Sequence, residues 1–336
     1  MSQLVSILIP AYNSERWIAH TIRSALAQTW QRKEIIIVDD GSKDGTLAIA
    51  RKFASKEVTV VTQENAGAST ARNKAFSICQ GDYIQWLDAD DLLSPDKLAA
   101  QMGALDQCRS KRTVLSSGYG MFIYRSRKAG FNPSDLWRDL LPVEWLMRRW
   151  EKNLYMQPAT WLASRELTLA AGPWDTRLSL DDDGEYFTRV VLASDCIKFV
   201  PEGRVYYRRG FDSLSYMGRS PKRMESQCLA IELQVRHVRT LGDTDRARAA
   251  CLKFSQSWLG AFYPERMDLV ERMKKLATEL GGELETPRLP PKYQWIQKTF
   301  GWDAAKRAQV FVPRIRRSLV RSWDRALYQL EGGAQS

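Results

Sequence analysis

The chain has 336 residues, 44% of them hydrophobic and 26% charged, which is ordinary for a globular protein able to bury a large core. Its net charge of +11 falls mainly on residues 219–336, which hold 22 Lys+Arg against 13 Asp+Glu. No stretch approaches the roughly 20 apolar residues of a membrane-spanning helix, and the N-terminus does not read as a signal peptide. Five scattered cysteines and only two histidines disfavour a zinc site and a serine–histidine triad, and favour reduced thiols in a cytoplasmic protein.

The first hundred residues alternate between apolar runs and helical patterns. Strands are predicted over 4–10, 34–38, 58–62 and 83–87, and helices after a cap at Asn13 or Ser14, over 44–55, over 68–79, and from Ser94 and Pro95 onward, with Ser94 as N-cap. Four strand–helix units predict an α/β fold with a mainly parallel, Rossmann-like sheet, which commonly binds a nucleotide at the strand C-termini. Neither GxGxxG nor GxxxxGK[ST] occurs, so a dinucleotide-binding dehydrogenase and a P-loop ATPase are disfavoured.

Acidic residues end two of these predicted strands. Asp39 and Asp40 follow the second strand, and Asp88, Asp90 and Asp91 follow the fourth. Three carboxylates at the end of a buried strand repel one another unless a cation joins them, and hard oxygen ligands suit Mg²⁺ or Mn²⁺. The alternative is an acidic turn that only opens a helix.

Four stretches, Pro10–Asn13, Val38–Ser42, Asn65–Asn73 and Leu87–Asp91, resemble in content and order the family 2 glycosyltransferases of bacterial type with the GT-A fold. The resemblance covers about the first hundred residues and continues more loosely to about residue 215. It implies an inverting hexosyltransferase-type enzyme that uses a nucleotide-diphosphate sugar and a divalent metal, Mn²⁺ or Mg²⁺.

The resemblance also implies roles for individual residues. Asp90 would be the direct metal ligand with Asp88 beside it near the ribose, Asp39 would bind the base, and Arg72 would lie near the diphosphate. The full set of implied nucleotide-binding residues is Pro10, Tyr12, Asn13, Asp39, Asn65, Gly67, Arg72, Asp88 and Ala89. The alternatives from the residues alone are a plain turn at Asp39 and a surface ion pair at Arg72.

Residues 101–180 give a coarser reading. A strand is predicted over 113–124, a loop over 126–135, a short helix over 142–150 and a strand over 156–164. Trp161 in the last of these could stack on an acceptor sugar, although core packing is the more common fate of tryptophan.

A second acidic stretch, Asp181–Asp183, precedes an apolar helical pattern. In the resembling family an acidic pair stands before a similar aromatic helix and its aspartate is the catalytic base, which matches Asp183 here. The additional Asp181 leaves the register open by one residue, with Asp182 the alternative. Without the resemblance, the stretch would read as an acidic first turn stabilised by the helix dipole.

Two short strands are predicted over 197–200 and 205–209, and Arg208 at the end of the second is a candidate contact for the donor phosphates. Its alternative is a surface ion pair.

The remainder, 219–336, is predicted to be a helical extension to a transferase domain spanning 1–218. Helices are expected over 224–240, 245–263, 264–280 and 313–330, with a stiff linker over 287–291. The last helix has apolar residues on one face and arginines around the other, which suits an anionic membrane surface. The alternative is that it packs on its own domain or on a second subunit; nucleic-acid binding is disfavoured.

These observations predict a glycosyltransferase acting on a glycan or lipid-linked acceptor in bacterial cell-surface polysaccharide synthesis, cytoplasmic and peripheral on the inner face of the membrane. The alternatives are a metal-dependent nucleotidyltransferase and a non-catalytic carbohydrate-binding module on the same scaffold.

Overall fold

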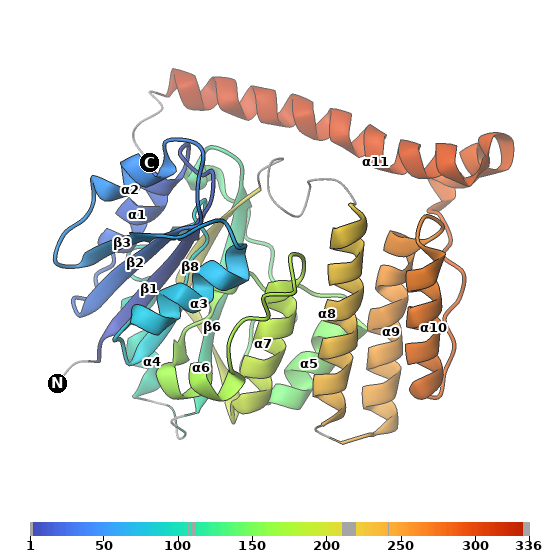
Figure 1. The fold of residues 1–336 in the computed structure, drawn as a ribbon, viewed down its shortest axis with the longest axis horizontal. Helices are drawn as coiled ribbons and strands as arrows, with labels where there is room; N and C mark the ends of the chain where they lie inside the picture. The colour runs from blue at the N-terminus through green and yellow to red at the C-terminus, as the bar shows by residue number, and fades with distance from the viewer. Residues whose placement is uncertain are drawn as a thin grey trace.

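A five-stranded sheet forms the centre of the N-terminal region, with the strand order β3-β2-β1-β4-β7. The computed structural model describes residues 3–106, 108, 110, 112–209, 220–240 and 242–331 (Figure 1). The strands are β1 (Val5–Ala11), β2 (Lys33–Asp39), β3 (Val58–Thr62), β4 (Tyr83–Trp86) and β7 (Ala163–Ser164). The first four pair in parallel and β7 is antiparallel to β4, which confirms the predicted mainly parallel sheet.

Helices cover both faces of this sheet because successive side chains of a strand point to opposite sides. The connecting helices are α1 (Ile18–Leu26), α2 (Thr46–Arg51), α3 (Ala68–Ile78) and α4 (Lys97–Leu105). Ile7 and Ile9 of β1 pack in one core cluster with residues of α1, α2 and α4, whereas Leu8 packs in another with α3. The parallel register aligns the C-terminal ends of β1 and β2, where Ala11 lies opposite Asp39.

A second sheet, β5-β8-β6, continues from the acidic turn after β4. Its strands are β5 (Leu92–Leu93), β6 (Thr113–Phe122) and β8 (Cys196–Arg208). The pairing of Leu92 with Tyr206 brings the end of β8 beside Asp88–Asp91. The two strands predicted over 197–200 and 205–209 are thus one strand, with an irregularity in its pairing opposite Ser117 and Gly118.

The following helices extend the core away from the sheet. They are α5 (Pro142–Glu151), α6 (Arg165–Ala171), α7 (Asp182–Ala193), α8 (Pro221–Arg239), α9 (Asp245–Phe262) and α10 (Met267–Glu279). One buried cluster runs from Trp86 of β4 through Tyr186 of α7 to Phe254 of α9 and Met273 of α10. The three predicted helices between 224 and 280 are confirmed, and α6 was not predicted.

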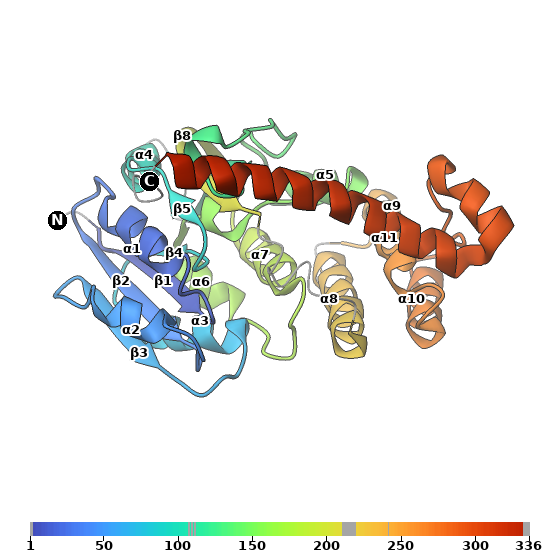
Figure 2. The ribbon, with the colours of Figure 1, turned by 90° about the horizontal axis from the view of Figure 1, so that it is seen from above.

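The last helix, α11 (Pro291–Leu330), bends at Gly301, whose φ of 82° is not helical. It crosses back over the molecule from the α8–α10 end to the α/β end (Figures 1 and 2). Asp324 accepts hydrogen bonds from Arg125 Nε at 2.7 Å and from the backbone N–H of Tyr124 at 2.9 Å. The alternative of packing on its own domain therefore holds for this end of the helix. Among the described residues, no helix is long and apolar enough to cross a membrane.

Three local predictions were wrong. Residues 156–164 form a 3-10 turn (Pro158–Thr160) and only the two-residue strand β7. Ser94 is not an N-cap, because its hydroxyl and its N–H bond the backbone of Arg204 across to β8. Trp17, without a side-chain cap, precedes α1 in place of Asn13 or Ser14. The predicted domain boundary at 218 and 219 lies outside the described residues, so the division into two domains stays a prediction.

Candidate active site

Arg72 joins the two acidic segments that the sequence singled out. Its Nη2 lies 2.9 Å from Asp88 Oδ1 and its Nη1 lies 2.7 Å from Asp182 Oδ2, so one buried guanidinium connects α3, the end of β4 and the start of α7. The charges of the two carboxylates outweigh the cost of burial and raise the pKa of Arg72. The interpretation of Arg72 as a surface ion pair is therefore wrong.

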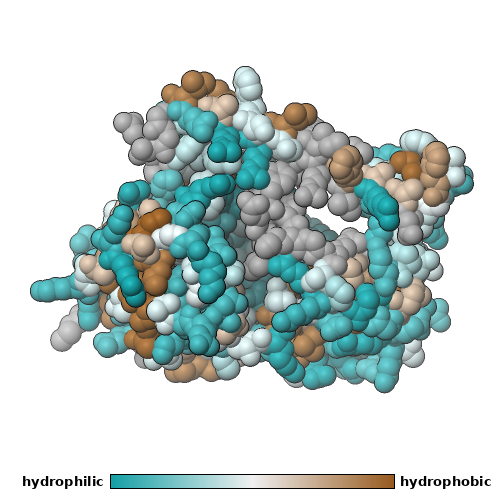
Figure 3. Space-filling view, turned by 45° about the horizontal axis from the view of Figure 1, so that its top comes forward, coloured by the Kyte–Doolittle hydropathy of each residue, from teal (hydrophilic) through white to brown (hydrophobic). Residues whose placement is uncertain are grey.

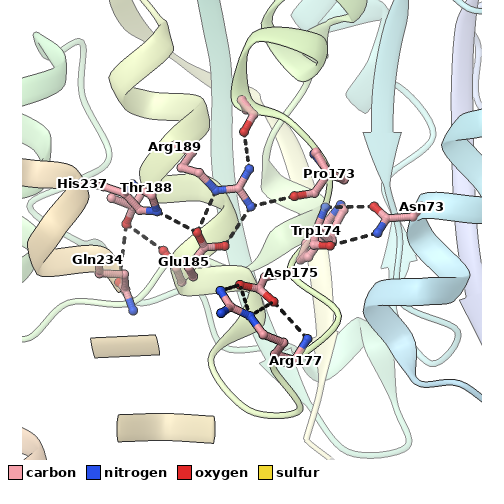
Figure 4. Close-up of polar contacts among 12 residues, drawn as sticks. Asn73, Pro173, Trp174, Asp175, Arg177, Glu185, Thr188, Arg189, Gln234 and His237 are labelled. Carbon is pink, nitrogen blue, oxygen red and sulfur yellow. Dashed lines mark hydrogen bonds and ion pairs between the residues drawn. The ribbon is translucent and has the colours of Figure 1, made fainter. Parts of the chain in front are cut away.

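Trp174 fixes Arg72 from the other side. The guanidinium carbon lies 4.2 Å from the centroid of the Trp174 ring, and that ring stacks on Tyr186 with centroids 4.0 Å apart. Asn73, the residue after Arg72, exchanges two hydrogen bonds with the backbone of Trp174, at 2.8 and 2.9 Å (Figure 4). The sequence reading missed Trp174, because no spacing connects it to a residue a hundred positions earlier.

A buried carboxylate anchors the loop that carries Trp174. Glu185 accepts hydrogen bonds from Arg189 at 2.7 and 2.8 Å, and its Oε1 lies 2.9 Å from His237 Nε2 of α8 (Figure 4). Arg189 also donates to the carbonyl oxygens of Ala171 and Pro173, which closes the loop against α7. The pKa of Glu185 is lowered by hydrogen bonds from His237 and Arg189, which outweigh its burial. This network holds Trp174, and through it Arg72, in place without itself lining the site.

The two aspartates after β2 have different partners. The carboxylate of Asp40 accepts from Gln63 Nε2, Asn65 Nδ2 and the N–H groups of Ala66 and Gly67, at 2.8 to 3.1 Å, and so shapes the loop before α3. Asn65 is thus engaged with Asp40. Gly67 supplies the left-handed φ of 93° before α3.

Asp39 has acceptor capacity left over. Its Oδ2 accepts from Thr62 Oγ1 at 3.1 Å and from the N–H of Ser42 at 3.3 Å, whereas its buried Oδ1 has no partner among the described residues. A buried carboxylate oxygen without a donor is costly, and an N–H group of a ligand would satisfy it. The interpretation of Asp39 as only a turn residue does not explain this oxygen.

The loop after β1 borders the same place. Pro10 is buried opposite Val38, and Tyr12 is 48% exposed. Asn13 has a φ of 46° and exchanges hydrogen bonds with the 42–43 loop, at 2.8 and 3.0 Å. Ala89 contributes its carbonyl to Thr21 Oγ1 at 2.9 Å, which ties the acidic turn to α1.

In the acidic turn after β4, one carboxylate is bonded inside the fold and two are partly exposed, where they could contact a ligand. Asp91 is fully buried and accepts from Gln157 Nε2 and from the N–H of Arg208 at 2.7 Å. Asp88 is 31% exposed, and Asp90 is half-buried. Burial, followed by the charge of Asp88, raises the pKa of Asp90 to about 6, and Arg208 opposes this. The charge of Asp88 therefore disfavours a second negative charge on Asp90.

Asp88 and Asp90 fit a divalent cation in charge and in chemistry, since Mg²⁺ and Mn²⁺ prefer oxygen ligands. Within the described ranges, no group of three or more His, Cys, Asp or Glu side chains could hold a metal ion. Two carboxylates would need oxygens of a diphosphate and of water to complete the coordination shell.

Arg208 is not placed as the sequence predicted. Its guanidinium is buried, donates to the carbonyl oxygens of Asp90 at 2.8 Å and Ile123 at 2.9 Å, and lies 3.9 Å from the Trp17 ring centroid. Burial lowers its pKa to about 10. The predicted contact with donor phosphates is therefore replaced by a role in holding the Asp90 backbone, and the alternative of a surface ion pair is wrong as well.

The three aspartates at the start of α7 have three different partners. Asp181, in a left-handed conformation, accepts from Gln234 at 2.7 Å and from Gln227 at 3.2 Å, both on α8. Asp182 pairs with Arg72, and Asp183 Oδ2 accepts from the hydroxyl of Tyr155 at 3.1 Å. Burial and then the charges of Asp182 and Asp181 raise the pKa of Asp183 to about 7. Such a group is partly ionised at neutral pH and can accept a proton.

Trp161 belongs to the core. It is 1% exposed, and its ring contacts Trp145 at 5.2 Å and Phe187 at 5.4 Å between centroids. The predicted contact with an acceptor sugar was wrong, and the alternative of core packing was right, because the surrounding helices and not the local sequence decide the burial of this residue.

The fold and the site define an α/β protein that presents acidic groups at the C-terminal edge of a parallel sheet. Residues 6–149 match the family model described as "Glycosyl transferase family 2", which confirms the resemblance that the motifs predicted. A relative named "Uncharacterized glycosyltransferase RT0329", from Rickettsia typhi, is 38% identical over 134 residues, which are 40% of this chain and 42% of the relative. A relative named "Chondroitin synthase", from Escherichia coli, is 36% identical over 143 residues, 37% of this chain and 20% of the relative. The chain thus spans less than half the length of these relatives.

Two solved structures share the fold. S. aureus TarS 1-349, in complex with UDP-GlcNAc, has a TM-score of 0.66 at 18% identity over 82% of this chain and 81% of that one. Mannosyltransferase PcManGT from Pyrobaculum calidifontis, in complex with GDP-Man and Mn²⁺, has a TM-score of 0.53 at 16% identity over 96% and 88%. At these identities the likeness establishes the GT-A-type fold, with further helices at the C-terminus.

Proposed function

We propose that the protein transfers a sugar from a nucleotide-diphosphate sugar to an acceptor hydroxyl, with inversion at the anomeric carbon. The observation that carries this proposal is the Arg72 bridge, because it fixes the start of α7, with Asp183, against the acidic turn that carries Asp88 and Asp90. A donor-side acidic pair and a proton acceptor are thereby held in one network. Direct displacement needs both and needs no covalent nucleophile.

On the donor side, the free Oδ1 of Asp39 would accept an N–H group of the base, with Tyr12 and the 42–43 loop beside it. Asp88 and Asp90 would hold Mn²⁺ or Mg²⁺, which when bound neutralises charge that develops on the departing diphosphate. Arg72, already paired with Asp88, holds that carboxylate in place. The neighbours named by title, with UDP-GlcNAc and with GDP-Man and Mn²⁺, support a nucleotide-sugar donor and a divalent ion.

On the acceptor side, Asp183 would take the proton of the attacking hydroxyl. Of the three aspartates, Asp181 is bonded to α8 and Asp182 to Arg72, which favours Asp183 over the alternative register. The relative named chondroitin synthase supports an acceptor that is a glycan, and we propose a growing or lipid-linked surface polysaccharide.

The exposed face of α11 supports attachment to an anionic membrane. Leu319 and Trp323 are 68% and 69% exposed, and Phe311 and Leu330 are exposed with them. Figure 3 shows hydrophobic side chains along the upper edge of the molecule, where α11 runs. Residues 219–336 carry a net positive charge, which would add attraction for anionic lipid headgroups to the contribution of the exposed apolar side chains. We therefore propose peripheral association with the inner face of the membrane.

The test is a screen of nucleotide sugars with and without Mn²⁺, in which release of the free nucleotide diphosphate is measured. Asp183→Asn should abolish transfer while nucleotide binding, followed by calorimetry, is kept. Asp90→Ala should lose metal-stimulated release. Undiminished transfer by Asp183→Asn would remove the proposed base.

A further inference from the structure

Tyr155 contacts the proposed base directly. It lies in the segment between α5 and the 3-10 turn, it is 41% exposed, and its hydroxyl donates to Asp183 Oδ2 at 3.1 Å. The other oxygen, Oδ1, accepts the N–H of Gly184 at 2.9 Å. Among the described residues, each oxygen of Asp183 therefore has one donor, and the donor on Oδ2 is a side chain that reaches solvent.

Tyr155 is also part of an aromatic group. Tyr119 of β6 and Tyr207 of β8 lie with ring centroids 6.2 and 6.3 Å from that of Tyr155, and 6.2 Å from each other. Burial, followed by the charges of Asp91, Asp90 and Asp183, raises the pKa of Tyr207. Tyr207 thus senses the charge of both acidic segments, and the ring group contacts the proposed base through Tyr155.

We propose that Tyr155 is a positioning residue for Asp183 and that its ring is one wall of a subsite for the acceptor sugar ring. This inference rests on the proposed function, in which Asp183 accepts the proton of the acceptor. The base, ribose and metal positions are assigned to Asp39, Asp88 and Asp90, so the acceptor hydroxyl has to reach Asp183 from another side, and Tyr155 is an exposed side chain bonded to it there. A tyrosine ring offers an apolar face to the C–H groups of a pyranose and a polar tip to the carboxylate.

The hydrogen bond has a defined effect on Asp183. A hydroxyl donor stabilises the ionised carboxylate, as does Arg72, whereas Asp181, Asp182 and Asp88 disfavour it. Removing the hydroxyl therefore raises the pKa of Asp183, so the acid limb of the rate profile moves to higher pH. Removing the ring has a different effect, because it takes away contact area for the acceptor.

Two variants separate these effects. Tyr155→Phe keeps the ring, so it should shift the acid limb of kcat/KM by about one pH unit upward while the acceptor KM changes less than about twofold. Tyr155→Leu removes both the hydroxyl and the aromatic ring. It should therefore show the same pH shift together with a rise of about tenfold in the acceptor KM, while the donor KM stays unchanged. Tyr206→Phe is the matched control, because Tyr206 is the neighbour of Tyr207 in β8 and its ring contacts Phe122 and Phe131.

An unshifted acid limb in Tyr155→Phe, or a wild-type acceptor KM in Tyr155→Leu, would overturn the inference. If Asp183→Asn abolishes transfer in the same assay, the proposed function stands while this inference fails. If Asp183→Asn transfers normally, the base assignment fails first. Circular dichroism of each variant checks that the fold is kept.

Discussion

Replacing Arg72 by methionine removes the positive charge that joins the two acidic segments. Two ion pairs of 2.7 and 2.9 Å disappear, and Asp88 and Asp182 are left close together without a counter-ion. Removing one partner of a buried pair costs about 3–5 kcal/mol. Because the side chains of Asp88 and Asp182 are 31% and 18% exposed, water recovers part of this loss, so we expect the low end, about 3 kcal/mol of unfolding free energy.

The measurement is urea-induced unfolding followed by tryptophan fluorescence and by circular dichroism. The matched control is Arg246→Met, which also removes an arginine from two carboxylates, Glu144 at 2.8 Å and Glu151 at 2.9 Å, but at a half-exposed position. It should cost at most about 1 kcal/mol. The double variant Arg72→Met/Asp182→Asn should recover part of the loss, since one uncompensated charge is gone. Equal losses in Arg72→Met and Arg246→Met would refute the reasoning.

Three further outcomes follow from the site and from α11. A carboxylate accepts a proton only when ionised, and the pKa of Asp183 is raised to about 7, so kcat/KM should fall about tenfold per pH unit below that value and level off above it; a profile flat from pH 5 to 8 would contradict this. Asp39→Asn places an amide where the unpartnered Oδ1 lies, so nucleotide affinity by calorimetry should fall about tenfold to a hundredfold, and unchanged affinity would exclude a contact with the base. Leu319→Glu/Trp323→Glu should reduce sedimentation with anionic vesicles at low salt, with neutral vesicles as the control, and full sedimentation would exclude this face as the attachment surface.

The sequence predicted the strands best where apolar residues run without interruption. The predicted strand over 58–62 coincides with β3. Those over 4–10 and 34–38 differ from β1 and β2 by one residue at each end, and the one over 83–87 extends one residue past β4. In residues 156–164, Gln157, Pro158 and Thr160 interrupt the apolar residues, and this stretch was misread as a strand. Most of these residues are buried without belonging to a strand. The side chain of Gln157 donates to Asp91 and accepts from the N–H of Ala159. The pairing that remains covers only residues 162–164, which is too short to leave a periodic signal.

For the site, the sequence pointed to Asp39, Asp88, Asp90 and the 181–183 stretch, and the resemblance implied a role for each, but the register between Asp182 and Asp183 stayed open. The roles within 181–183 depend on contacts from residues far along the chain. Gln234 donates a hydrogen bond to Asp181, Arg72 forms an ion pair with Asp182, and Tyr155 donates a hydrogen bond to Asp183. Residue spacing also does not indicate when a guanidinium donates to backbone carbonyl oxygens. Arg208 does so, and its predicted contact was therefore misplaced.

The end of α11 is connected to the donor side through packed rings. Tyr328 packs on Tyr124 with centroids 5.9 Å apart, Tyr124 packs on Trp17 at 5.6 Å, and Arg208 lies on Trp17 while its Nε holds the carbonyl of Asp90. The basic composition of residues 219–336 distinguishes them from the rest of the chain. Their packing does not, because α8–α10 share one hydrophobic core with β4 and α7. A helix that pairs Asp324 with the domain and leaves Leu319 and Trp323 exposed can hold the Asp90 turn with one face while the other stays available for a surface.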